Sequence, residues 1–163
     1  MTKLLPIDTI RLAASIVVCM LAGFIGSFAT RAGIPVWYAG IQKPSFNPPS
    51  WVFGPVWTFL YILMAIALFL VWRQGLAVSG VRIALFVFFL QLVLNAVWSF
   101  AFFGARSPLA GLVVIIALWG AIVATIALFA PLSRWAAVLL VPYILWVSFA
   151  AILNWSIYVL NRR

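Results

Sequence analysis

Residues 109–129 read LAGLVVIIALWGAIVATIALF, a run that contains no charged side chain. A helix of about 20 apolar residues is long enough to cross the ~30 Å hydrocarbon core of a membrane. Comparable runs lie at 12–30, 53–72, 82–103 and 135–160. The sequence therefore predicts an all-α integral membrane protein, a bundle of five transmembrane helices that forms a single domain over residues 1–163.

The overall composition also indicates a protein that lies in the lipid bilayer. The chain is 68% hydrophobic and 7% charged, and Asp8 is its only acidic side chain against ten lysines and arginines. The bases are spread singly between the apolar runs, which is typical of anchors at lipid head groups and argues against binding to nucleic acid. We therefore expect membrane lipids as partners.

The charges do not choose an orientation. One side of a five-span bundle would carry Lys3, Arg11, Arg73, Arg82 and Arg134, and the other Arg31, Lys43, Arg106, Arg162 and Arg163. The positive-inside rule cannot separate two sides with equal numbers of bases. No organelle-targeting leader is obvious, which favours a bacterial cell membrane without distinguishing the inner from the outer one.

Conventional catalytic chemistry is largely excluded by residue type. The chain has no histidine and one cysteine, Cys19, so it cannot form an internal disulfide or a histidine-ligated metal site. Histidine-based acid–base catalysis is excluded for the same reason. We predict no catalytic residue, no metal and no cofactor.

Tryptophan is unusually frequent and unusually placed. Nine are present, and Trp119 and Trp146 fall near the centres of apolar runs instead of at their ends. An indole N–H at that depth needs a partner inside the protein, because lipid offers none. We predict that the deep indoles line a space for a flat, apolar, aromatic molecule.

Polar side chains mark a face of the third run. Gln91, Asn95 and Trp98 are spaced i, i+4 and i+7, so they share one side of a helix. An unpaired amide in hydrocarbon costs on the order of 2–7 kcal/mol, so this side must point into the bundle. The amides either bridge helices or orient a ligand in an apolar pocket, and the spacing favours neither.

Two other runs carry aromatic or small residues at helical spacing. These are Phe53, Trp57 and Tyr61 in the second run, and Pro142, Trp146, Ala150 and Asn154 in the fifth. A proline inside a span kinks the helix, and Pro142 is expected to open space near Trp146. Core packing is the alternative interpretation of each stripe taken alone.

Small residues recur along two faces. They are Ser15, Cys19, Gly23, Gly26 and Thr30 in the first run, and Ala117, Ala121, Ala124 and Thr125 in the fourth. Small side chains let helix backbones approach closely in lipid. We interpret both faces as packing surfaces, within the bundle or between two copies.

The joint at residues 31–52 is the longest and contains the most specific motif. Residues 37–61 read WYAGIQKPSFNPPSWVFGPVWTFLY. The prolines at 44, 48 and 49 predict a stiff, extended loop that could cover a pocket. The segment resembles the W-Y-x-x-L-x-K-P-x-x-x-P-P-x-W-x-F-x-x-x-W-x-x-L-Y signature of the TspO/MBR family, the bacterial tryptophan-rich sensory proteins and the translocator proteins, or peripheral-type benzodiazepine receptors. Ile41 replaces leucine, and residues 95–99 (NAVWS) and 141–146 (VPYILW) extend the resemblance over the chain.

The resemblance implies a five-helix bundle, usually a homodimer, with a pocket below the first loop that binds porphyrins and related flat hydrophobic ligands. By position, the pocket would be lined by Tyr38, Pro48, Pro49, Phe53, Trp57, Asn95, Trp98, Trp146 and Ala150. The implied function is a membrane receptor or sensor for tetrapyrroles, with porphyrin as ligand and not as cofactor. Alternatives are light- and oxygen-dependent porphyrin degradation, or transport of porphyrin or sterol. A loose sterol pattern at Leu153, Tyr158 and Arg162 is better interpreted as interfacial anchors.

Overall fold

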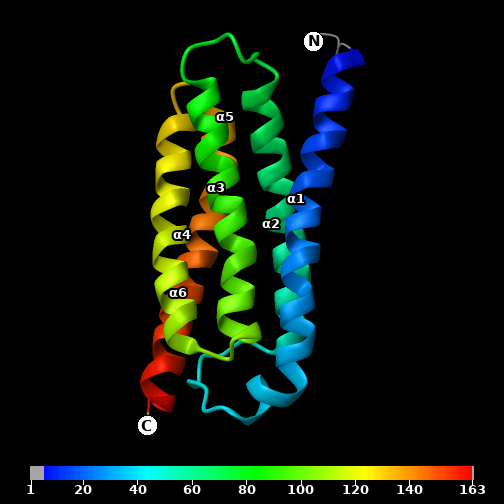
Figure 1. Cartoon of the computed structure of the whole chain (residues 1–163). Coiled ribbons are helices and arrows are strands. Elements are labelled where there is room, and N and C mark those ends of the chain that lie inside the picture. Colours follow the sequence, from blue (N-terminus) through cyan, green and yellow to red (C-terminus); the bar gives the residue numbers. More distant parts are fainter. Residues whose placement is uncertain (1–5, 163) are drawn as a thin grey trace.

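The computed structural model describes residues 6–162 (Figure 1). Five helical segments in this range are long and apolar enough to span a membrane, which confirms the predicted all-α five-span fold. The elements are α1 (Pro6–Gly33) with the π-helical turn η1 (Ile34–Tyr38), α2 (Ser50–Trp72), α3 (Val81–Ser99) with the π-helical turn η2 (Phe100–Gly104), α4 (Pro108–Phe129), α5 (Arg134–Leu139) and α6 (Val141–Asn161). Lys3 and Arg163, two of the bases weighed for orientation, lie outside the described residues.

The first span is longer than the expected 12–30, and the joint expected at 31–52 is shorter. Pro35 does not end the helix, because the chain continues through η1 in a wider turn. There the backbone N–H of Ala39 donates to the carbonyl of Ile34, five residues back. Proline has no backbone N–H to donate to the carbonyl four residues earlier, and the wider π-helical turn accommodates the missing hydrogen bond. Only residues 41–49 remain as a non-helical loop.

The fifth span is broken where Pro142 predicts a kink. α5 ends at Leu139 and α6 begins at Val141, with Pro142 in its first turn. Proline has no N–H to give to the carbonyl four residues earlier, so the helix cannot run through unchanged. The break lets the two helices follow different directions, with α5 against α2 and α6 against α4.

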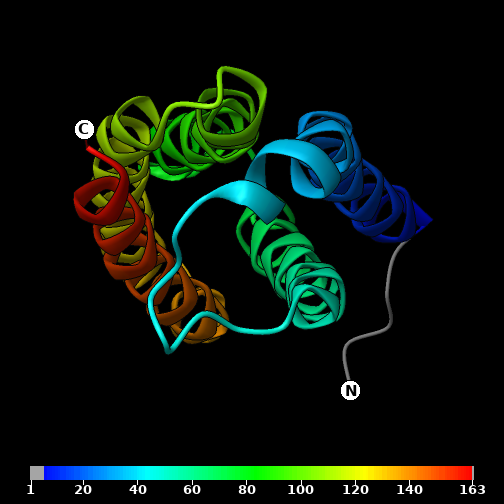
Figure 2. The same cartoon turned by 90° about the horizontal axis from the view of Figure 1, so that it is seen from below.

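The helices form an incomplete ring. α1 packs against α2 and α3, and α4 packs against α3 and α6. Figure 2 shows the bundle from the end where loop 41–49 crosses beneath it, from η1 past α6 to the start of α2. This arrangement brings α1, α2, α3 and α6 around one space at the loop end of the molecule.

Glycines in α1 set how closely its neighbours approach, as the small-residue stripe predicts. A Cβ atom on Gly23 would overlap the ring of Tyr61, and one on Gly26 would lie 3.0 Å from Oγ of Ser99. Ser15 and Cys19 on the same stripe are fully buried. On α4, Thr125 is buried and donates to a backbone carbonyl of its own helix. The stripe on α1 therefore serves packing within the bundle, whereas on α4 only Ala121 and Thr125 are buried, and Ala117 and Ala124 are exposed.

The end of the bundle away from the loop is filled by side chains. Residues with no exposed surface there include Met64, Ala67, Val71, Val81, Ala84 and Phe88. Phe88 of α3 stacks on Phe129 of α4, with ring centroids 5.7 Å apart. Asp8 lies near the start of α1. Its Oδ1 is 3.5 Å from Nη1 of Arg11, and its Oδ2 is 3.7 Å from Nη2 of Arg73 at the end of α2. This ion pair ties the two helices together at the filled end.

Candidate ligand-binding site

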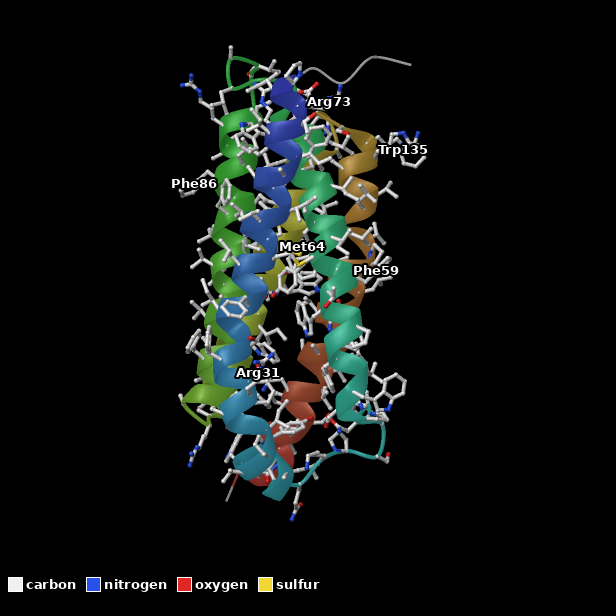
Figure 3. The ribbon with its side chains drawn as sticks, turned by 90° about the vertical axis from the view of Figure 1, so that its right-hand side faces the viewer. Arg31, Phe59, Met64, Arg73, Phe86 and Trp135 are labelled. Carbon is white, nitrogen blue, oxygen red and sulfur yellow. The ribbon has the colours of Figure 1, made fainter. Side chains whose placement is uncertain are left out.

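A cavity of about 460 Å³ lies between α1, α2, α3 and α6 at the loop end of the bundle. Its wall includes exposed residues of both α1 (Phe24, Arg31) and α2 (Gly54, Thr58), so the cavity opens sideways between these helices. Figure 3 faces this opening, with Arg31 labelled on α1 beside it. Since the opening lies along membrane-spanning helices, a ligand can reach the cavity from the lipid.

Aromatic rings make up two walls. On α2, the ring of Trp57 lies 5.7 Å from that of Tyr61, at an angle of 30°. On the opposite side, Trp98 of α3 stacks on Phe102 of η2, with centroids 5.5 Å apart and planes 20° apart. All four residues line the cavity. Trp98 and Phe102 are four residues apart, so their side chains are neighbours on the same side of the helix.

The inner end of the cavity is a chain of buried hydrogen bonds. Tyr61 Oη donates to Asn95 Oδ1 (2.5 Å), and Asn95 Nδ2 donates to Tyr143 Oη (3.0 Å). Tyr143 Oη in turn donates to Gln91 Oε1 (2.9 Å). An asparagine amide has two N–H groups, and Tyr143 takes only one of them from Asn95. The second N–H of Asn95 has no recorded partner within residues 6–162, and Asn95 lines the cavity.

The spacing of Gln91, Asn95 and Trp98 leaves open whether the amides bridge helices or face the cavity, and this network distinguishes the two roles. The amides bridge helices, because Asn95 links α3 to both α2 and α6. Gln91 is 1% exposed, does not line the cavity and keeps a buried Nε2 without a partner in the described chain. Bridging and contact with the cavity therefore coexist at Asn95, whereas Gln91 only bridges.

Trp98 is held in place by a second asparagine. Its indole Nε1 donates to Asn154 Oδ1 (3.1 Å), and Asn154 Nδ2 donates to the carbonyl of Pro108 (2.7 Å). Gly111 gives this amide its room, because a Cβ there would lie 2.8 Å from Asn154 Oδ1. Asn154 thus joins α3, α4 and α6 and fixes the plane of the Trp98 ring.

The loop end is closed by η1 and residues 41–49. Tyr38 Oη donates to Asn47 Oδ1 (2.6 Å), which fastens the loop over the cavity. Gln42 and Asn161 exchange two hydrogen bonds, of 3.0 and 2.9 Å, so the loop is also fastened to the end of α6. These contacts favour access from the side over access through the loop.

The structure brings six of the nine predicted site residues to the cavity wall: Tyr38, Phe53, Trp57, Asn95, Trp98 and Ala150. Pro48, Pro49 and Trp146 are not part of that wall. Trp146 lies behind Phe53, with ring centroids 5.9 Å apart, and borders a shallow apolar depression between α2 and α6 on the outer surface. Its indole N–H is buried without a partner in the described chain.

The expectation for Trp119 is wrong in one respect. Its N–H has the required partner, Ser148 Oγ at 2.9 Å, but the ring is 44% exposed and lies outside the cavity. Depth in the membrane does not determine which way a side chain points, because every span also has a face toward lipid. The convergence of indoles thus holds for Trp57 and Trp98.

Sequence reasoning missed the contribution of the α1 glycines and of Tyr143. Gly23 and Gly26 of α1 line the cavity, although the stripe that contains them predicts packing alone. Tyr143 is fully buried below the wall, where it orders Asn95. A signal for Tyr143 was available, because it lies one residue after Pro142 and about one turn before Trp146.

These features define a class: a helical membrane protein whose aromatic cavity opens sideways between two helices and is closed at one end by a proline-rich loop. Residues 15–160 match the TspO/MBR family. The chain belongs to this family, as the resemblance of residues 37–61 predicts.

Individual relatives agree with this assignment. The chain is 47% identical over 154 residues to the tryptophan-rich protein TspO of Archaeoglobus fulgidus, covering 94% of this chain and 99% of that protein. It is 41% identical over 137 residues to the translocator protein of Homo sapiens, covering 83% and 80%. It is 39% identical over 125 residues to the tryptophan-rich sensory protein of Cereibacter sphaeroides, covering 77% of each.

Proposed function

We propose that this protein is a membrane receptor or sensor that binds tetrapyrroles of the protoporphyrin type, and other flat hydrophobic molecules, in the cavity between α1, α2, α3 and α6. The observation that carries the proposal is an apolar space of about 460 Å³ bordered by Trp57 and by the Trp98–Phe102 stack. Small-molecule sites commonly occupy 300–1,000 Å³ and combine apolar walls with a few polar groups.

The wall suits a planar ring. Aromatic faces pack on other aromatic faces in offset or edge-on contacts. Asn95 offers a free amide N–H at the inner end, where it can orient the ring. The chain has no histidine to serve as a strong axial ligand for iron, so metal-free porphyrin suits the site better than haem.

The proposal is tested by titrating protoporphyrin into the purified protein in lipid nanodiscs and following tryptophan fluorescence. Trp57→Leu and Trp98→Leu are each expected to raise the Kd about tenfold, because each removes an aromatic contact of about 1 kcal/mol and part of the buried ring surface. Trp135→Leu is the matched control, since Trp135 is 75% exposed on α5 and lies outside the cavity (Figure 3). Equal affinity in all four proteins would remove the cavity as the binding site.

We also propose that the protein works as a homodimer in a bacterial membrane. Support for the dimer comes from the outward face of α4, where Ala117, Gly120 and Ala124 are exposed and a Cβ on Gly120 would meet no atom within 4 Å. Small residues in lipid allow a second helix to approach closely. Light scattering of the detergent-solubilised protein should show a dimer, and Gly120→Leu should shift it toward the monomer. The similarity to the tryptophan-rich sensory protein of Cereibacter sphaeroides supports the bacterial location.

A further inference from the structure

Arg31 brings a positive charge to an otherwise uncharged cavity. It lies in the last turn of α1 and is the one charged residue among those that line the cavity in the described part of the chain. It is exposed beside the opening between α1 and α2 (Figure 3). No hydrogen bond or ion pair involves its guanidinium within residues 6–162. The charge is thus presented to whatever enters from the side.

This chain has no acidic side chain that can neutralise Arg31. Asp8 is the only one in the sequence, and it contacts Arg11 and Arg73 at the opposite end of the bundle. It precedes Arg31 by 23 positions on the same helix, which is about 35 Å at 1.5 Å per residue. A side-chain counter-ion must therefore come from outside the polypeptide.

Lys43, the other base near the loop, is committed elsewhere. Its Nζ donates to the carbonyls of Ala39 (3.3 Å) and Ile41 (3.1 Å). The ammonium also lies 5.0 Å from the centre of the Tyr38 ring, within reach of a cation–π contact. Lys43 therefore stabilises the end of η1, and it does not line the cavity. Arg31 is left as the base that can meet a ligand.

The position of Arg31 determines how long a ligand must be to contact both ends of the cavity. Gly23 packs on the ring of Tyr61, whose hydroxyl bonds to Asn95 at the inner end of the cavity. Arg31 follows Gly23 by eight positions on α1, which is about 12 Å along the helix. A ligand that spans the cavity would contact amide and phenol groups at one end and a guanidinium at the other, with an aromatic body between them.

We propose that Arg31 selects ligands whose flat apolar body carries a carboxylate at the edge facing the opening between α1 and α2. This inference rests on the proposed function and names the substrate class of that same site: anionic amphiphiles in preference to neutral molecules of the same shape. Arginine suits the role because its planar fork can bind a carboxylate through two parallel hydrogen bonds. Its aliphatic stem can stay among the apolar groups of the wall.

The test uses two probes that share one ring system: protoporphyrin IX, a dicarboxylic acid, and its dimethyl ester, which is neutral. Both are titrated into the full-length protein in phosphatidylcholine nanodiscs, which carry no net charge to compete for Arg31, and tryptophan fluorescence reports the Kd. The variants are Arg31→Gln and Arg31→Lys. The control is Arg106→Gln, because Arg106 is exposed on the same side of the membrane but does not line the cavity.

The unmodified protein should bind the acid more tightly than the ester. Arg31→Gln should raise the Kd for the acid about tenfold, as expected for loss of a charge-assisted pair, and leave the Kd for the ester within about twofold. Arg31→Lys should keep part of the preference because it retains the charge. Arg106→Gln should behave like the unmodified protein. Unchanged binding of the ester also shows that each variant is folded.

Other results would overturn the inference. Equal binding of acid and ester by the unmodified protein would remove the role of Arg31 and leave the proposed function intact. An equal loss of the preference in Arg106→Gln would assign it to the overall positive charge of this face. Failure of the unmodified protein to bind either probe would overturn the proposed function, and the inference with it.

Discussion

The two ends of this bundle use the same helices differently. At the end that carries Asp8 and Arg73, side chains fill the interior, and Phe88 and Phe129 have no exposed surface. At the loop end, α1 and α2 diverge around a cavity of about 460 Å³. Packing is continuous in the first region, whereas in the second, aromatic rings surround a space, and hydrogen bonds hold Tyr61 and Trp98 in place there.

The difference shows how a cavity can be kept open in lipid. Apolar side chains of moderate size interdigitate and close the gap between helices. Large rings cannot do so when their polar atoms are anchored, as Trp98 is by Asn154 and Tyr61 by Asn95. The hydrogen bonds hold each ring at the wall and prevent collapse. The filled end then supplies the stability that the hollow end lacks.

The largest expected effect is the loss of unfolding free energy on truncating a side chain at the filled end, compared with the same truncation at the hollow end. Phe88→Ala should lower the free energy of unfolding by about 3 kcal/mol or more, because it empties a fully packed site beside Phe129. Phe53→Ala should cost clearly less, because Phe53 already borders a cavity. Thermal unfolding in nanodiscs compares the two variants. Equal losses would mean that the hollow end is packed as tightly as the filled one.

A smaller effect is expected from the network below the cavity. Tyr143→Phe removes one hydroxyl and leaves both Asn95 Nδ2 and Gln91 Oε1 without a partner. Each stranded buried group costs about 1–3 kcal/mol, so a loss of about 2 kcal/mol in unfolding free energy is expected. Tyr158→Phe is the control, because Tyr158 is only partly buried near the end of α6. Similar stability of the two variants would show that the network carries no net energy.

The ion pairs of Asp8 with Arg11 and Arg73 at the filled end should contribute still less to the unfolding free energy. Asp8→Asn removes the charge that holds Arg11 and Arg73, and both arginine side chains are partly exposed, at 26% and 32%. Partly exposed pairs contribute about 1 kcal/mol or less. A double-mutant cycle with Arg73→Gln isolates the α1–α2 pair. Purely additive losses would show that the two residues do not interact.

The smallest effect on stability should come from a substitution at the cavity wall. Ala150→Leu places three more carbon atoms on α6 where the cavity has room, so the unfolding free energy should change by less than about 1 kcal/mol. The same change should weaken protoporphyrin binding about tenfold, since the added atoms occupy ligand space. Ala127→Leu, on an exposed position of α4, is the control. Unchanged affinity in Ala150→Leu would place the ligand elsewhere.

Much of the fold follows from the sequence because hydropathy and proline act locally. A run such as 109–129 can only cross a membrane as a helix, and Pro142 interrupts its helix wherever the rest of the chain lies. Pro35 and Pro55 are exceptions, since the π-helical turn η1 accommodates Pro35 and α2 runs through Pro55. Whether a proline ends a helix or widens it depends on the packing of the next turn, which spacing does not reveal.

The candidate site could be predicted only in part. The polar face of α3 must point inward, so spacing places Asn95 and Trp98 inside the bundle, and the family resemblance assigns them to the pocket. Trp146 and Trp119 are not at the cavity. The sequence does not reveal this, because an aromatic side chain in a membrane helix can face the interior, a neighbour or lipid at similar cost. The wall formed by α1 was missed since glycine shows that something approaches closely, without showing whether it is a helix or a space.

The central claim is that the space between α1, α2, α3 and α6 is the ligand-binding site. The most direct measurement is an experimental structure of the protein with protoporphyrin. The account predicts a ring between Trp57 and the Trp98–Phe102 stack, with a carboxylate directed toward Arg31 at the opening between α1 and α2. A ring bound in the outer depression beside Trp146, with the cavity unfilled, would contradict it.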